Sequence, residues 1–147
     1  MVVAGYLDSL GRTLGNSIVS SWWKLPIPAG WTFRHDRECT TITTPLQVTA
    51  LQISAARKSG DVTDGDLREF ADDHLTRGAT TRGVEVGDFE GFVFAYRDES
   101  AHWRQWFLRR GNLAIFVTYN CPPKFKGHED CVVDTVLAKL CINDGAP

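Results

Sequence analysis

The sequence predicts an α+β fold: a single domain in which an antiparallel meander sheet has helices packed on it. Strand-like segments occur in two runs, each followed by a helix-like segment, and do not alternate as βαβ units do. The chain has 147 residues, a length typical of one domain. Its composition, 43% hydrophobic and 23% charged, is that of a globular protein. We expect this domain over residues 22–142 and a tail over residues 143–147.

The first run contains three or four predicted strands, beginning with a short extended segment in "WWKLPIPAGW" (22–31). "WTFRHD" (31–36) and "CTTITT" (39–44) are rich in β-branched and aromatic residues and indicate a hairpin, and "VTALQISAA" (48–56) follows. Residues 1–21 precede this run. Val3, Leu7, Leu10 and Leu14 recur at helical spacing, although three glycines weaken a helix there. A leader or a short packing helix is therefore expected for 1–21.

Two helices are predicted from their periodicity and their ends. "VTDGDLREFADDHLTRG" (62–78) begins at an N-cap, Thr63 or Asp64, and ends at Gly78. "GHEDCVVDTVLAKLC" (127–141) is the second helix. Each carries an apolar stripe expected to face the core. The stripes are Leu67, Phe70, Ala71 and Leu75 in the first helix, and Val133, Val136, Leu137 and Leu140 in the second.

The second run of strands contains a hairpin whose register can be predicted. The preceding segment, 84–98, is expected to break at Gly87-Asp88. Gly111-Asn112 then separates two strand-like runs and suits a two-residue turn. That turn pairs Leu108 with Ile115. One face of the hairpin is then a core face, with Trp106, Leu108, Leu113, Ile115, Val117 and Tyr119.

The opposite face of this hairpin has too many aromatic residues for a solvent-exposed surface, so either a helix or a partner is expected to cover it. Aromatic residues and arginine are enriched at protein interfaces. The tryptophans at the start of the first run are a further pair of candidate anchors. The candidate binding residues are Trp103, Phe107, Arg109, Phe116, Trp22 and Trp23.

Charge and hydropathy limit the function classes. The net charge is −2, whereas nucleic-acid-binding domains are usually basic, so we expect no nucleic-acid partner. No apolar stretch approaches the roughly 20 residues of a membrane helix, so no membrane association is expected. The first residues lack a secretory pattern. We therefore expect a cytoplasmic protein whose four cysteines are reduced.

The quoted patterns resemble the small α/β domains of the PsbP and DcrB type. The resemblance rests on "LPIPAGWTF", "ALQIS", "DLREFADDHL" and "FEGFVFAYRDE" followed by "WRQWFLRRGNLAIFVTYNCP", and spans about residues 22–142. It implies an α/β/α arrangement. Members of this superfamily are mostly binding and adaptor proteins, including bacterial chaperones and immunity-like proteins. The resemblance carries no catalytic motif and leaves the partner open.

No catalytic or metal-binding constellation is predicted. His128 and Cys131 are the only close ligand pair near the C-terminus, and structural zinc sites use two such pairs. The four histidines are scattered, and His74 lies at the edge of a helix stripe, where packing is the simpler role. No cofactor is expected, because no glycine-rich phosphate loop is present.

The leading hypothesis is a non-enzymatic protein-binding domain of bacterial type: an adaptor, an effector-associated chaperone or an immunity-like protein. The alternative is a small-molecule-binding protein or enzyme that uses a cleft between sheet and helix. In that case His74 or His102 should meet a carboxylate at about 3 Å, the reach of a general base. The sequence does not predict the oligomeric state.

Overall fold

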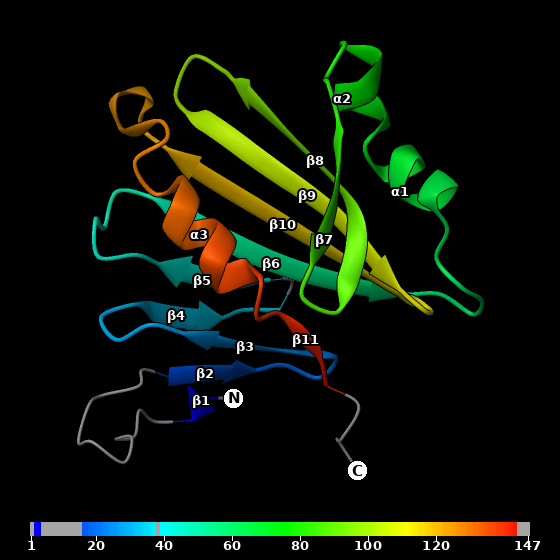
Figure 1. Ribbon diagram of the computed structural model, residues 1–147, viewed down its shortest axis with the longest axis horizontal. Helices are drawn as coiled ribbons and strands as arrows, with labels where there is room; N and C mark the ends of the chain where they lie inside the picture. Colours follow the sequence, from blue (N-terminus) through cyan, green and yellow to red (C-terminus); the bar gives the residue numbers. More distant parts are fainter. Residues whose placement is uncertain (1, 4–15, 38, 144–147) are drawn as a thin grey trace.

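The computed structural model describes residues 2–3, 16–37 and 39–143, which form two antiparallel sheets with helices packed on the larger one (Figure 1). The seven-stranded sheet has the order β4 (Thr32–His35), β5 (Thr40–Thr43), β6 (Ala50–Arg57), β10 (Leu113–Cys121), β9 (His102–Arg110), β8 (Phe89–Arg97), β7 (Arg82–Val86). The four-stranded sheet has the order β1 (Val2–Val3), β2 (Asn16–Val19), β3 (Trp23–Ile27), β11 (Cys141–Ile142).

The helices are short. They are α1 (Asp64–Phe70), α2 (Asp72–Thr76), the 3-10 turn η1 (Pro123–Phe125) and α3 (Asp130–Leu137). Within the described ranges, none has the length and apolar character needed to cross a membrane. The order of strands and helices confirms the predicted α+β arrangement, with meander, helix, meander and helix following one another.

The predicted β9–β10 register is confirmed. Leu108 pairs with Ile115 and Trp106 with Val117 across the turn, where Gly111 has φ 54°. The predicted core face of this hairpin is at most 2% exposed. It faces the main core, which lies between the large sheet, the small sheet and α3 (Figure 1).

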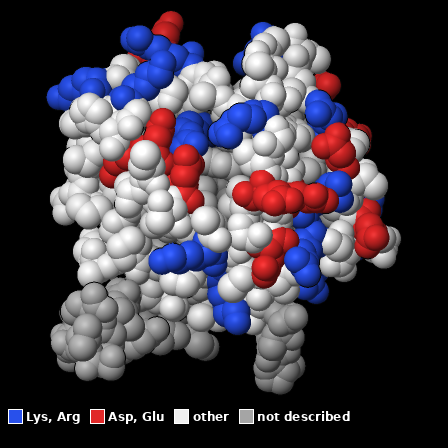
Figure 2. All heavy atoms as spheres, viewed as in Figure 1, with Lys and Arg blue, Asp and Glu red and all other residues white. Residues whose placement is uncertain are grey.

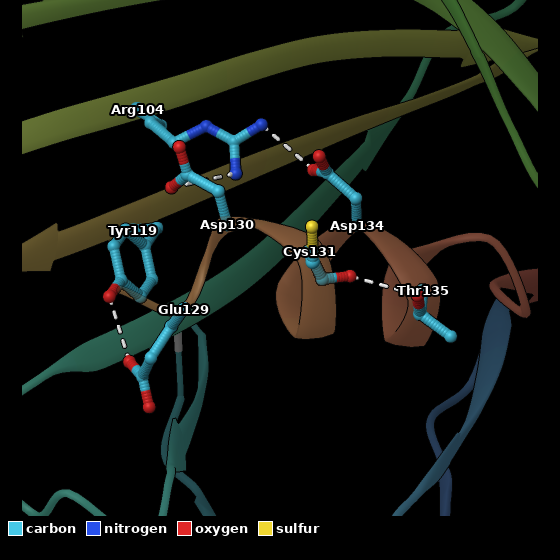
Figure 3. A network of polar contacts seen from close by, with 7 residues as sticks. All are labelled: Arg104, Tyr119, Glu129, Asp130, Cys131, Asp134 and Thr135. Atoms are coloured by element: carbon cyan, nitrogen blue, oxygen red, sulfur yellow. Dashed lines mark hydrogen bonds and ion pairs between the residues drawn. The ribbon is translucent and has the colours of Figure 1, made fainter. Parts of the chain in front are cut away.

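A polar network fixes α3 over this core (Figure 3). The Tyr119 hydroxyl on β10 donates to Glu129 Oε1 at 2.7 Å, and both side chains are buried. Arg104 on β9 donates from Nη2 to Asp134 Oδ1 at 2.8 Å, and its guanidinium lies 4.6 Å from the ring centre of Trp106. These contacts join the start and the middle of α3 to neighbouring strands.

On the opposite face of the large sheet, α1 and α2 cover a second, smaller core. Thr63 caps α1 through a capping box with Asp66, which confirms the predicted start of this helix. The chain leaves helical geometry at Ala71, so the one predicted helix is two short ones. The buried members of this core are Val62, Leu67, Ala71, Phe92, Phe94, Phe107 and Ala114.

The small sheet corrects two sequence-based expectations. Residues 16–19 are a strand where a leader or packing helix was expected; residues 4–15 lie outside the described part of the chain. The predicted C-terminal helix ends at Leu137, and Cys141 pairs with Lys24 of β3. In both places the backbone bonds to β3, whose N–H and C=O groups need partners that a helix would not supply.

Candidate binding surface

The helices α1 and α2 cover only part of their face of the large sheet. The register places Phe116 beside Ser54 and Phe107, and Thr118 beside Gln52 and Gln105. Most side chains not covered by a helix are partly exposed and uncharged, and we call these uncharged side chains the open face; the exposed Arg34, paired with Thr41, lies beside them. The open face comprises Thr41, Gln52, Ser54, Trp103, Gln105, Phe116 and Thr118.

Hydrogen bonds hold the polar groups of the open face in place. Gln105 donates to the Tyr96 hydroxyl at 2.9 Å, and Gln52 donates to Thr41 at 3.2 Å. The Trp103 ring stacks on Tyr96, with centroids 6.0 Å apart, and its Nε1 donates to Asp98 at 2.8 Å. Because these side chains are fixed before a partner arrives, little conformational entropy remains to be lost on binding.

Phe70, the last residue of α1, is 60% exposed at the border of the open face. The sequence predicted it within the buried stripe, and this prediction was wrong. Its ring meets Phe116 of the central strand β10 edge to face, with centroids 5.0 Å apart. The paired residues Ala56 and Ala114 form the floor beside it and are too short to fill the space below the helix.

The missing side-chain volume leaves a hollow of about 300 Å³ between α1 and the ends of β6 and β10. We call it the α1 hollow. It is lined by Ala56, Arg57, Lys58, Val62, Asp66, Glu69, Phe70 and Ala114. Its floor and one wall are apolar, while charged side chains lie at its rim.

The charges at this rim are of both signs: Arg57 and Lys58 line it together with Asp66 and Glu69. Lys58 Nζ is 2.7 Å from Asp66 Oδ2, and this hydrogen bond, with one from the Thr63 amide, lowers the pKa of the Asp66 carboxyl. Glu69 and Asp72 flank Phe70 on either side of the helix break and are exposed. Neither forms an ion pair with any residue in the described ranges.

The structure separates the binding residues predicted on the β9–β10 hairpin. Trp103 and Phe116 lie on the open face and are partly exposed. Phe107 is 7% exposed in the core beneath α1, which leaves it no surface for a partner. Arg109 lies toward the other end of β9, 3.2 Å from Glu90 Oε1. Only Trp103 and Phe116 therefore remain on one candidate surface.

The predicted tryptophan pair lies on the other side of the large sheet. Trp23 is 2% exposed in the main core. Trp22 packs against the edge of that core, with the Arg57 guanidinium 5.1 Å from its ring centre. Neither belongs to the open face, so the two predicted groups of anchors are not brought together.

The described residues contain no arrangement that points to catalysis or metal binding. No group of three or more potential metal ligands occurs among them. His74 lies against Phe94 and Tyr96, with centroids 5.1 and 4.8 Å away, which agrees with the predicted packing role. His102 is buried, and burial lowers its pKa. In the described part of the chain neither histidine has a hydrogen bond or ion pair to a carboxylate.

Surface charge does not form one basic field. Figure 2 shows small clusters of acidic and basic side chains alternating over the face that it presents. Two arginines of β9 form ion pairs with carboxylates: Arg104 with Asp134, and Arg109 with Glu90.

The sequence matches no protein-family model and no curated protein. Similar solved structures do exist. A protein from Bacteroides thetaiotaomicron VPI-5482 has a TM-score of 0.67 at 19% identity over 90% of this chain, and this chain spans 50% of that protein's length. LpqN of Mycobacterium tuberculosis, described as involved in cell envelope biogenesis, has a TM-score of 0.62 at 12% identity, covering 82% of this chain and 83% of LpqN.

Cyanobacterial PsbP (CyanoP) from Synechocystis sp. PCC 6803 is also similar. Its TM-score is 0.59 at 11% identity, and the match covers 97% of this chain and 92% of CyanoP. The chain therefore has the PsbP-like α+β fold that its sequence patterns predicted. At these identities the likeness concerns the fold alone.

Proposed function

We propose that this chain is a non-enzymatic protein-binding domain whose partner docks on the open face and on Phe70. In this proposal it acts in the cytoplasm as an adaptor, an effector-associated chaperone or an immunity-like protein. The observation that carries the proposal is the exposure of Phe70, 60%, beside a preorganised and uncharged sheet face. Interfaces typically combine such an aromatic anchor with a polar surround.

Two features of the open face support a protein partner. Aromatic rings and hydrogen-bonding amides or hydroxyls alternate on it, which suits the mixed surface of another protein. The Phe116 ring contacts both Phe70 and Phe107, with centroids 5.0 and 5.7 Å away. It therefore supports the exposed Phe70 ring on the side that faces the sheet. A supported ring keeps one orientation and can serve as a rigid anchor.

A second candidate function is small-molecule binding in the α1 hollow. The hollow lies between sheet and helix, as the alternative hypothesis required, and its volume of about 300 Å³ is at the lower end of the range for ligand pockets. Native mass spectrometry of the protein purified from its host would detect an occupant. A bound small molecule that Ala56→Leu removes would favour this second function.

Site-specific photocrosslinking tests the first proposal. A photoreactive phenylalanine analogue would replace Phe70 or Phe116 in the host cell, and crosslinked proteins would be identified by mass spectrometry. Val48 and Val132 provide matched controls, because they are exposed apolar residues, 48% and 39%, on other elements.

We expect one protein to crosslink from positions 70 and 116 and not from positions 48 and 132. The same yield from all four positions would show only non-specific contact and would contradict the proposal. The absence of any protein crosslink at positions 70 and 116 would also contradict it.

A further inference from the structure

We infer that the partner segment docked at Phe70 is basic and inserts one large apolar side chain into the α1 hollow. This inference rests on the proposed protein-binding function and specifies the chemistry of its partner. It is argued from the shape of the hollow and from the charges that surround it.

The shape of the hollow suits one inserted side chain. Ala56 and Ala114 form its floor, Val62 and Phe70 supply apolar wall, and its volume is about 300 Å³. Val62 and Ala114 are buried, at 4% and 2% exposed, so they are fixed in the small core. An apolar side chain placed there would cover this floor and part of the exposed Phe70 ring, as anchor residues do in protein interfaces.

Over α1 and α2, on either side of Phe70 in the sequence, carboxylates outnumber basic side chains, although Arg57 and Lys58 also line the hollow. Asp64 is 2.7 Å from Arg68, and Asp66 is 2.7 Å from Lys58, so these two carboxylates are compensated. The three others on this helix pair have no ion pair within the described part of the chain, and they surround Phe70 in sequence. They are Glu69, Asp72 and Asp73.

Local structure explains these three carboxylates only in part. Asp72 and Asp73 lie in the first turn of α2, where a negative charge is favourable. Glu69 lies in the last turn of α1, where the helix dipole disfavours a carboxylate. Asp72 and Asp73 follow it across the helix break and carry the same charge. A lysine or arginine from a partner would compensate these charges.

Other occupants fit less well. A second copy of this chain would bring a second set of uncompensated carboxylates into the interface, and nucleic acid would be repelled by them. An acidic or neutral peptide would leave Glu69 uncompensated beside the buried floor. Charge complementarity therefore selects a basic segment.

The test uses a phage-displayed library of random 12-residue peptides, selected on the intact protein. Peptides recovered from the library would be synthesised, and their affinities measured by fluorescence anisotropy at low and at physiological salt. Two variants address the two parts of the inference. Ala56→Leu fills the α1 hollow, and Asp72→Asn with Asp73→Asn removes two of the uncompensated charges.

Matched controls are available for both. Val48→Ala removes an exposed apolar side chain elsewhere, and Glu85→Gln with Glu99→Gln removes two exposed carboxylates from other elements. Circular dichroism and thermal unfolding check that each variant is folded. Phe70→Ala is the second probe of the apolar contact, because an exposed side chain can be truncated at little cost to stability.

We expect recovered peptides to combine lysine or arginine with one large apolar residue. Their affinity should fall about tenfold in Ala56→Leu and in Phe70→Ala, as for an anchor residue. It should fall less in the double Asp→Asn variant, which should also reduce the salt dependence. The two controls should leave the affinity unchanged.

Two failures are distinguishable. Neutral or acidic peptides that lose binding in Phe70→Ala would overturn the basic partner and leave the proposed function standing. Peptides that bind equally well to Phe70→Ala, Ala56→Leu and wild type would overturn both, because no protein segment would then use this surface.

Discussion

Small residues determine the candidate site as much as large ones do. Phe70 is exposed because Ala56 and Ala114, paired across β6 and β10, do not reach it. With larger residues at these positions, the ring would become a buried member of the stripe that its helical spacing predicts. The exposure of one aromatic ring therefore follows from two alanines on other elements.

A second residue-scale effect concerns Gly87 in the β7–β8 turn. It has φ 57°, and a Cβ at this position would lie 1.8 Å from the Leu140 carbonyl oxygen. Gly87→Ala should therefore lower the free energy of unfolding by more than about 2 kcal/mol, as expected when positive φ and a backbone clash combine. Urea denaturation measures this loss.

Gly111→Ala is the matched control, because Gly111 has φ 54° and open space around its Cα. Its cost should be limited to about 1–2 kcal/mol of backbone strain. Equal losses for the two variants would show that the close approach to Leu140 contributes nothing.

The histidine on β9 should make stability depend on pH. Burial, together with the nearby charge of Lys126, lowers the pKa of His102 below its ordinary value of 6.5. As the pH falls through 6.5, the unfolded chain takes up a proton before the folded chain does. Stability is therefore lost as the pH falls from 6.5 to the folded-state pKa.

This loss can be measured by urea denaturation at pH 8 and pH 5.5. The decrease in unfolding free energy should be smaller in His102→Gln than in wild type. Burial also lowers the pKa of His35, but that histidine is present in both proteins and its contribution cancels. Identical decreases in the two proteins would contradict the prediction.

At the scale of elements, α3 depends on buried polar contacts as well as on its apolar side. Tyr119 and Glu129 are 1% and 7% exposed and are joined by one hydrogen bond. Burial also raises the pKa of the Tyr119 hydroxyl, which therefore remains a donor at physiological pH. Removal of one partner leaves the other buried and unsatisfied.

A double-mutant cycle tests this contact. Tyr119→Phe should lower the free energy of unfolding by about 1–3 kcal/mol, because it leaves the Glu129 carboxylate without its hydrogen-bond donor. Tyr119→Phe combined with Glu129→Met should cost less than the sum of the single changes, with a coupling of about 1 kcal/mol or more. Additive losses, measured by chemical denaturation, would show that the bond stabilises nothing.

The elements that the sequence predicted best are those whose signals are local. The Gly111-Asn112 turn, with side chains that alternate between the two faces of the strands on either side of it, was enough to predict the β9–β10 register. The end of α3 and the existence of β11 were not predictable in this way. They depend on β3, more than a hundred residues earlier: Cys141 lies beside Lys24, and its Sγ is 3.8 Å from the Lys24 carbonyl oxygen.

The candidate site was predictable only in part for the same reason. Trp103 and Phe116 followed from the alternation along the hairpin, which assigns both to the second face. The hollow requires the register between β6 and β10 and the position of α1 above it. Two alanines in separate strands carry no local signal of their common location, so Phe70 was assigned to the core.

For the molecule as a whole, Asp88 connects the two sheets. Its amide donates to the Leu140 carbonyl at 3.0 Å, and its Oδ2 accepts from the Ile142 amide at 3.0 Å. Asp88→Ala should therefore speed hydrogen exchange of the Ile142 amide, while the amides of the β9–β10 hairpin keep their protection. Asp72→Ala, an exposed aspartate on α2, serves as the control.

Uniformly faster exchange across both sheets in Asp88→Ala would show a global loss of stability and would contradict this local role. Unchanged exchange at Ile142 would show that the β11–β3 pairing holds without the carboxylate.

The small sheet joins the beginning of the described chain to its end, since β3 pairs on one side with β2 and on the other with β11. During synthesis on the ribosome, β2 and β3 therefore emerge long before their last neighbour exists. The side chains of Trp23 and Leu25 are buried in the final fold, but they cannot be fully covered before α3 and β11 have been translated. Such late closure leaves the nascent chain open to aggregation or to chaperone binding until α3 and β11 are made.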